Sequence, residues 1–169
     1  MQSGTGAVVV ALYGEAPQGL EQRLAAFCRA GLRVVAVNNN APRTPPRSTD
    51  EHLTWLENGN EGGLAGGLNH GVHEALALGC EQITLLDQDS NLSADGVLTL
   101  QQAVASQPDR VAGPAIWDLE RARWHTRQSR PRLLITSGTT FHASTWQRVG
   151  PYHDWMEIDF IDHEWCSRA

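Results

Sequence analysis

Cysteine is scarce in this sequence, and no apolar run is long enough to span a membrane. The 169 residues include three cysteines, Cys28, Cys80 and Cys166. Their odd number and irregular spacing argue against a disulfide framework and a metal site, and favour buried thiols in a reducing compartment. The apolar stretch 7–13 is too short to cross a bilayer, and no basic residue precedes it to make a secretion signal. We therefore expect a cytoplasmic protein.

The sequence also contains few basic residues. Lysine and arginine together number 13 against 19 acidic residues, which gives a formal charge of -6. A protein that binds nucleic acid through its backbone needs a basic face, so we expect no nucleic-acid partner. A phosphorylated ligand would instead need a metal ion or a few placed arginines. The apolar content of 41% is typical of an ordinary globular α/β protein.

Continuous runs of β-branched residues predict buried strands, and helical patterns separate them. Runs without apolar–polar alternation are typical of strands covered on both faces in a mainly parallel sheet. The helical patterns end at Gly31 and Gly79, as helices commonly do. The strands are expected at 7–12, 33–37, 82–86 and, as a short one, 52–57; the helices are expected at 20–28 and 64–76. This order predicts an α/β fold: a doubly wound, mainly parallel sheet of Rossmann-like type with helices on both faces.

The second half of the chain continues the same pattern. We expect a helix capped by Ser93, strands at 110–117 and 133–138, an exposed hairpin or loop at 118–132, and a short helix with a capping box at Ser144 and Gln147 that ends at Gly150. A proline-rich loop, 38–51, leaves the carboxyl end of a strand, where binding loops belong. We find no repeat or linker, which predicts a single domain over residues 1–169.

Two aspartates follow the strand at 82–86 directly. Asp87 and Asp89 are placed where ligands bind in parallel sheets, beyond the carboxyl ends of the strands. Mg²⁺ or Mn²⁺ is typically held by one or two carboxylates plus the phosphate oxygens of a ligand. An Asx turn is an equally good interpretation of the tripeptide alone. A haloacid dehalogenase-like phosphatase is disfavoured, because Asn91 occupies the position where that class generally has Thr or Val.

Glycines crowd the start of the expected second helix, in "NGNEGGLAGGLNHG" (58–71). They would let backbone N–H groups approach an anionic ligand, although close packing of the helix on the sheet explains the motif alone at least as well. A P-loop is excluded because no Lys-Ser/Thr pair follows. His70 and His73 share a helix face, but without a third ligand they are interpreted as surface residues.

Acidic residues also crowd the end of the chain, at Glu157, Asp159, Asp162 and Glu164. Carboxyl groups beside apolar bulk tend to have raised pKa values, which suits a general base. An acidic helix start is the alternative, because negative charge is favourable at a helix N-terminus.

These segments, taken in order, resemble the family 2 glycosyltransferases of GT-A fold, and bacterial dTDP-rhamnosyltransferases in particular. The strand ending in "VNNN", the glycine-rich helix start, "LLDQDS", "TSG" and "FIDHEWCSRA" carry the resemblance over nearly the whole chain. It implies a metal-dependent, inverting transfer of rhamnose from dTDP-rhamnose to a cell-surface polysaccharide or a lipid-linked acceptor. The alternative is a non-catalytic nucleotide-sugar binding domain or a truncated remnant.

The resemblance also implies a role for each matching residue. Asp87 and Asp89 match the D-x-D motif, in which the second aspartate coordinates Mg²⁺ or Mn²⁺ on the donor diphosphate and the first lies near the ribose or the metal. Asp162 matches the general base that deprotonates the acceptor hydroxyl. The nucleotide cleft would include Tyr13, Asn38, Asn60, Gly62, Gly63 and Asp87.

The sequence departs from the family in three places. Asn38 occupies the position of an aspartate that accepts a hydrogen bond from a uracil or thymine ring, and its neutral amide forms a weaker bond. Tyr13-Gly14-Glu15 stands where Tyr-Asn-Pro is common. Family members also continue past the position of Ala169 with a segment that closes the acceptor site and often meets the membrane. We therefore expect a domain truncated at its C-terminus, with any peripheral membrane association carried by the missing segment.

Overall fold

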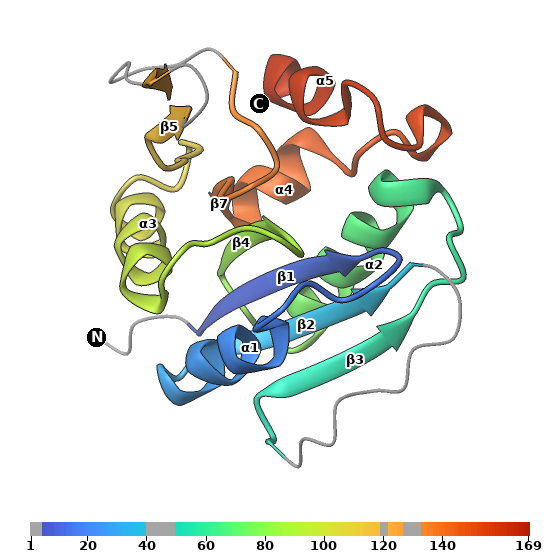
Figure 1. Cartoon of the computed structure of the whole chain (residues 1–169). Helices are drawn as coiled ribbons and strands as arrows, with labels where there is room; N and C mark the ends of the chain where they lie inside the picture. The colour runs from blue at the N-terminus through green and yellow to red at the C-terminus, as the bar shows by residue number, and fades with distance from the viewer. Residues whose placement is uncertain (1–4, 40–49, 119–121, 127–132) are drawn as a thin grey trace.

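A five-stranded sheet covered by helices forms the body of the protein, as the computed structural model shows (Figure 1). The structure describes residues 5–39, 50–118, 122–126 and 133–169. Its elements are β1 (Gly6–Leu12), α1 (Leu20–Arg29), β2 (Arg33–Asn38), β3 (Leu53–Glu57), α2 (Gly63–Ala77), β4 (Gln82–Asp87), α3 (Ala94–Ser106), β5 (Ile116–Asp118), β6 (Arg123–Thr126), β7 (Thr140–His142), α4 (Ala143–Val149), the 3₁₀ helix η1 (Asp154–Met156) and α5 (Ile161–Arg168).

The strand order confirms the expected mainly parallel, doubly wound sheet. The order is β3-β2-β1-β4-β7, in which β1 pairs in parallel with β2 and β4, β2 pairs in parallel with β3, and β7 is antiparallel to β4. The arrowheads of β1, β2 and β3 point the same way in Figure 1. The register pairs Asn38 with both Leu12 and Glu57, and Ala11 with Asp87. The last residues of the parallel strands therefore share one edge of the sheet.

Both faces of the sheet are buried, which explains the unbroken apolar strands. Val9 and Ala11 of β1 belong to the core on the α2 side, whereas Val8 and Val10 belong to the core under α1. The two helices lie on opposite sides of the sheet (Figure 1). Every residue of β1 is buried, so no polar side chain could alternate into the run without losing its water.

An aromatic cluster ties the last two helices to the sheet. Phe141, Trp146, Tyr152 and Trp165 pack with ring centroids 5.1 to 5.8 Å apart. The Trp165 indole N–H donates a 2.8 Å hydrogen bond to the Gly150 carbonyl, so the indole is satisfied although it is fully buried. These contacts fix the start of α5 relative to the end of β4.

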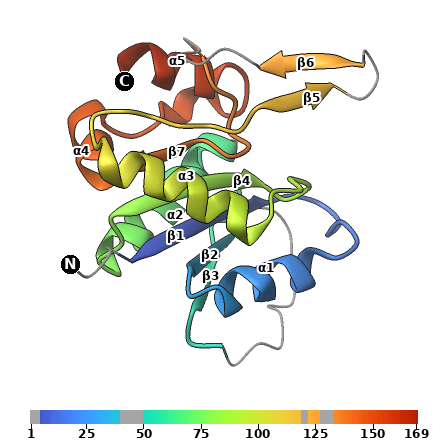
Figure 2. The same cartoon turned by 90° about the vertical axis from the view of Figure 1, so that its left-hand side faces the viewer.

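The strand expected at 110–117 is wrong. Ala112 forms only an isolated bridge with Thr140, and the short β5 at the end of this stretch leaves the main sheet and pairs with β6. Pro114 lies between them and has no N–H to donate to a ladder, which ends the pairing. The β5–β6 pair extends away from the sheet (Figure 2), which confirms a hairpin in the described part of 118–132; residues 119–121 and 127–132 lie outside it.

The strand expected at 133–138 is also wrong, because the strand that joins the sheet is the short β7 just after it. Gly138 has a φ of 88°, which is a turn conformation, and its N–H donates to the Leu85 carbonyl at 2.8 Å. The apolar run therefore approaches β4 through a turn before pairing begins.

Of the two helix N-caps expected from the sequence, one is confirmed and the other is wrong. Ser93 caps α3 as expected, since its hydroxyl accepts a hydrogen bond from the Gly96 N–H. The capping box at Ser144 is wrong: α4 is capped by His142, whose Nδ1 accepts from the Ser144 N–H at 3.2 Å, because the turn begins directly at the end of β7. The expected end of α4 at Gly150 is confirmed. Across the described ranges, no helix has the length and apolar character needed to cross a bilayer.

Candidate functional site

Asp87 and Asp89 lie on a tight turn at the carboxyl end of β4. The Asp87 N–H donates to the Ser90 hydroxyl and the Ser90 N–H donates to the Asp87 carbonyl, both at 3.0 Å. Among the described residues, no hydrogen bond to either aspartate carboxylate is present, so the turn is closed by Ser90 and the Asx-turn interpretation is wrong. Asp87 is half-buried and Asp89 is exposed. Both carboxylates are therefore available to a ligand.

The pKa of Asp87 is sensitive to two other carboxylates, those of Asp89 and Asp162. Burial first, and then the negative charges of Asp89 and Asp162, raise the pKa of Asp87 to about 6. Asp162 belongs to the first turn of α5, far away in the sequence. The structure thus brings together the D-x-D pair and the expected base. Such a group of carboxylates is destabilised by mutual repulsion until a cation or a proton joins it.

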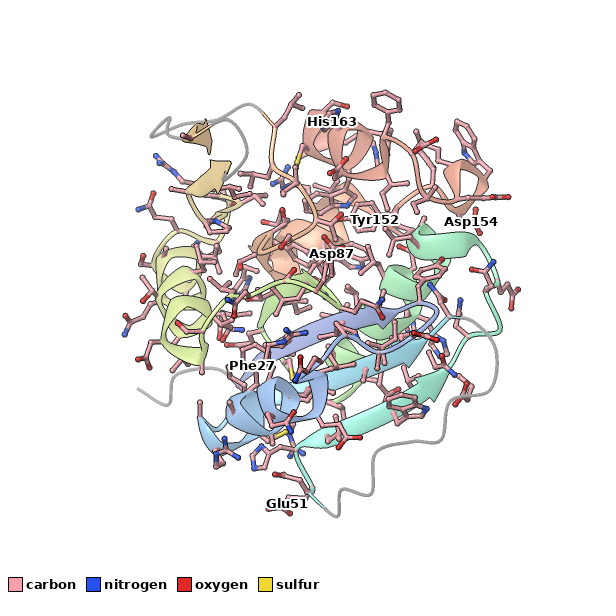
Figure 3. All side chains as sticks on the ribbon, viewed as in Figure 1. Phe27, Glu51, Asp87, Tyr152, Asp154 and His163 are labelled. Atoms are coloured by element: carbon pink, nitrogen blue, oxygen red, sulfur yellow. The ribbon has the colours of Figure 1, made fainter. Side chains whose placement is uncertain are left out.

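Asp162 is held by the helix that it begins. Its Oδ1 accepts the His163 N–H at 2.8 Å, and the residue that caps the helix, Phe160, has a φ of 60°. A positive φ at an aromatic residue is unfavourable, so tertiary contacts must impose this sharp entry into α5. In Figure 3, Tyr152 lies between Asp87 and the helix that carries His163.

Tyr152 is a buried residue on which the charges of Asp87 and Asp162 act, and the sequence did not predict it. Burial raises its pKa well above the usual value, and the charges of Cys166, Asp162 and Asp87 act in the same direction. The side-chain amide of Asn69 pairs with the Tyr152 backbone, accepting its N–H and donating to its carbonyl, each at 2.9 Å. Asn69 in "LNHG" thus acts as a clamp: its two hydrogen bonds connect α2 to the turn before η1.

The glycines at the start of α2 have a packing role. Gly62 and Gly63 have φ values of 64° and 61°. A Cβ on Gly62 would lie 2.8 Å from the Asp154 Cβ, and one on Gly63 would lie 2.9 Å from the Glu157 backbone. The Ala65 N–H donates to the Glu157 carbonyl at 2.9 Å. The glycines therefore admit segment 154–157 against the helix start, and their contact with a nucleotide stays a prediction.

Tyr13 connects the loops that surround the expected nucleotide cleft. Its hydroxyl donates to the Asn60 Oδ1 at 2.9 Å, and its N–H donates to the Gln88 Oε1 at 3.0 Å. Asn60 is in the left-handed region, with a φ of 62°. Residues following β1, β3 and β4 are thus joined at the carboxyl edge, and their contact with a nucleotide stays a prediction.

Asn38 lies at the same edge and is almost fully buried, with 2% of its surface exposed. Its Nδ2 donates to Glu57 Oε2 at 2.7 Å, and its buried Oδ1 has no hydrogen-bond partner among the residues that the structure describes. Glu57 also accepts from the Trp55 indole at 2.7 Å. The sequence did not predict Glu57, because only the parallel register of β2 and β3 places it beside Asn38.

The carboxylates of Asp87 and Asp89 fit a divalent cation of the expected kind. In the part of the chain that the structure describes, no three His, Cys, Asp or Glu residues are grouped to hold a metal by themselves. Mg²⁺ and Mn²⁺ do not need such a cage, since phosphate oxygens and water complete their coordination. His70 instead contacts the Asn58 Oδ1 at 3.3 Å and His73 is exposed, in line with their interpretation as surface residues.

Comparison with known proteins finds similarity both in sequence and in structure. No family model matches the chain. The dTDP-rhamnosyl transferase RfbF of Shigella flexneri is 26% identical over 137 residues, which are 70% of this chain and 46% of that protein. The chain thus spans less than half the length of this relative.

The structural match concerns the fold. The crystal structure of GalNAc-T7 with UDP, GalNAc and Mn²⁺ superposes with a TM-score of 0.73 and 11% identity, covering 99% of this chain and 40% of the other. At this identity the match shows the arrangement of the sheet and helices, which is the GT-A arrangement. The chain therefore has the GT-A fold of the glycosyltransferases and is related in sequence to a dTDP-rhamnosyl transferase.

Proposed function

We propose that the chain is the donor-binding domain of a metal-dependent, inverting family 2 glycosyltransferase. The donor is dTDP-rhamnose, and the acceptor is a cell-surface polysaccharide or a lipid-linked saccharide. One observation carries the proposal: Asp87 ends β4 at the carboxyl edge of a GT-A sheet, and the charges of Asp89 and Asp162 both act on its carboxyl group. The relationship to RfbF supports rhamnose as the sugar.

Asp87 and Asp89 would hold Mg²⁺ or Mn²⁺ against the donor diphosphate. The bound ion supplies positive charge that stabilises the departing diphosphate. Asp87 carries a pKa of about 6, so a cation beside it also removes the unfavourable repulsion within the carboxylate group. Tyr13 and Asn60 form the wall of the nucleotide cleft through their hydrogen bond.

Asp162 would act on the acceptor. In an inverting transfer, the acceptor oxygen bonds to the anomeric carbon while the bond to the diphosphate breaks, and the acceptor proton passes to a carboxylate. Oδ1 of Asp162 already accepts the His163 N–H. We therefore assign the proton to Oδ2. Glu164, on the same helix, does not suit this role, because it is paired with the Arg168 guanidinium at 2.5 Å.

Calorimetric titration with dTDP and UDP, in Mn²⁺ and then in EDTA, tests the donor site. We expect binding that requires the metal, is tighter for dTDP, and is lost in Asp89→Ala. Asp109→Ala is the matched control, because Asp109 is also exposed but lies beyond α3. Equal binding in EDTA, or in the Asp89 variant, would refute a metal-held diphosphate.

The base has a separate test. Asp162→Asn should abolish transfer or donor hydrolysis while leaving donor affinity within about twofold, because a base that acts on the acceptor contributes little to donor binding. A large loss of donor affinity would instead place Asp162 in the metal site. Binding without turnover in the unmodified chain would support the alternative, a nucleotide-sugar binding domain.

A further inference from the structure

Asn38 and Glu57 form a locked pair at the ends of two adjacent strands. They are register partners at the carboxyl ends of β2 and β3, which lie side by side in Figure 1. Glu57 accepts from the Asn38 amide through Oε2 and from the Trp55 indole through Oε1, each at 2.7 Å. Both carboxylate oxygens are engaged, so the carboxylate has little freedom to turn.

This pair decides which way the Asn38 amide faces. A carboxylate only accepts hydrogen bonds, so the NH₂ group of the amide must face Glu57 and the carbonyl oxygen must face away from it. Asn38 is only 2% exposed, and within the ranges 5–39, 50–118, 122–126 and 133–169 no donor is hydrogen-bonded to its buried Oδ1. Buried acceptors are rarely left without a donor in folded proteins, and such an exception points to a ligand.

This acceptor lies beside the residues of the proposed nucleotide cleft. Asn38 pairs in register with Leu12, and the next residue, Tyr13, forms the cleft wall with Asn60. A base in this cleft presents the edge that distinguishes pyrimidines: uracil and thymine carry an N3–H donor, whereas the cytosine N3 is an acceptor. An acceptor held in one orientation therefore selects the first two bases.

We propose that Glu57 is a positioning residue that holds the Asn38 Oδ1 toward the base, where it accepts the N3–H of uracil or thymine and rejects cytosine. This inference rests on the proposed donor function. The Oδ1 atom is closed to solvent in this structure, so side chains beside it must shift to admit the base. The negative charge behind the amide stays on Glu57, which offsets the neutral side chain at position 38.

Base selectivity after a change at Glu57 tests the inference. We expect the unmodified chain with Mn²⁺ to bind dTDP and UDP at least about tenfold more tightly than CDP, since a site built for a hydrogen bond rejects a ligand that cannot form it. In Glu57→Gln, the new amide can donate as well as accept, so the Asn38 amide is free to turn over. The ratio of CDP to UDP dissociation constants should therefore fall toward one. Glu61→Gln, which changes an exposed residue in the next loop, should leave this ratio unchanged.

Two further variants separate a role in orientation from a loss of folding. The double variant Asn38→Asp and Glu57→Gln exchanges acid and amide, leaves a fixed acceptor at position 38, and should restore the preference. Trp55→Phe keeps a ring in place but removes one hydrogen bond to Glu57, and should give an intermediate preference. If Glu57→Gln does not fold, the base preference of Trp55→Phe tests the inference in its place.

Each outcome decides something. A preference that is unchanged in both Glu57→Gln and Trp55→Phe, or equal binding of CDP and UDP to the unmodified chain, would overturn the inference alone. No metal-dependent nucleotide binding by the unmodified chain would refute the proposed function, and the inference with it.

Discussion

Replacing Asp87 with asparagine should stabilise the metal-free protein while removing its function. Burial and two neighbouring carboxylates raise the pKa of Asp87 from 3.8 to about 6. The folded state therefore binds a proton more tightly than the unfolded state does, and this group makes stability fall as the pH rises from about 4 to about 6. An asparagine is neutral at every pH and never incurs that penalty.

The size of the effect follows from the shift. A displacement of about two pH units corresponds to about 3 kcal/mol at pH values above the folded pKa. Asp87→Asn should therefore raise the free energy of unfolding by up to about 3 kcal/mol at pH 7.5. The gain should disappear below about pH 4, where the aspartate is protonated in both states.

Urea unfolding in EDTA at pH 7.5 and again near pH 4 measures this difference. Asp109→Asn, at an exposed position, controls for the substitution itself. The reasoning would be refuted if Asp87→Asn were less stable than the unmodified chain at pH 7.5. It would also be refuted if the variant raised the free energy of unfolding by the same amount at pH 7.5 and near pH 4. The same variant should lose metal-dependent nucleotide binding, so stability and function should move in opposite directions.

Three further measurements test the same geometry. Metal-dependent nucleotide binding should weaken about tenfold between pH 7.5 and pH 5, because about one Asp87 carboxyl in ten is then ionised at a pKa of about 6. Titration calorimetry at both pH values measures this change, and equal affinities would contradict the prediction. Asn69→Ala should cost about 2 kcal/mol in urea unfolding, because it leaves the buried Tyr152 backbone without partners; an unchanged midpoint would refute the clamp. Gly63→Ala should destabilise more than Gly79→Ala: both glycines have positive φ, but only the first meets a neighbour within 4 Å. Equal losses in the two variants would show that the contact is unimportant.

The parallel half of the fold could be predicted from the sequence because β1, β2 and β4 are buried on both faces, whereas only the edge strand β3 is partly exposed. Unbroken runs such as 7–12 have one stable environment, the middle of a parallel sheet, and glycines mark where the helices end. The antiparallel edge could not be predicted in the same way. The stretch 133–138 also begins with an apolar run, but the pairing partner on β4 and the turn at Gly138 decide which residues join the sheet.

Some residues of the candidate site could likewise be predicted from the sequence, and others could not. Asp87 and Asp89 are recognisable because their position after a strand already places them at the carboxyl edge. Glu57, Asn69 and Tyr152 are not recognisable, because each acts only through a contact with a residue distant in sequence or on a neighbouring strand. A local pattern carries no information about such partners.

The glycine-rich motif shows how one local pattern can serve a distant site. Gly63 leaves room for the Glu157 backbone, and Asn69, on the same helix, clamps Tyr152. Together these contacts anchor both ends of the segment that leads into α5, and so fix the position of Asp162 relative to Asp87. The glycines thus support the chemistry through packing, whether or not a nucleotide touches them. A loosened α2 contact should therefore weaken turnover through the placement of Asp162, before it affects the turn that carries Asp89.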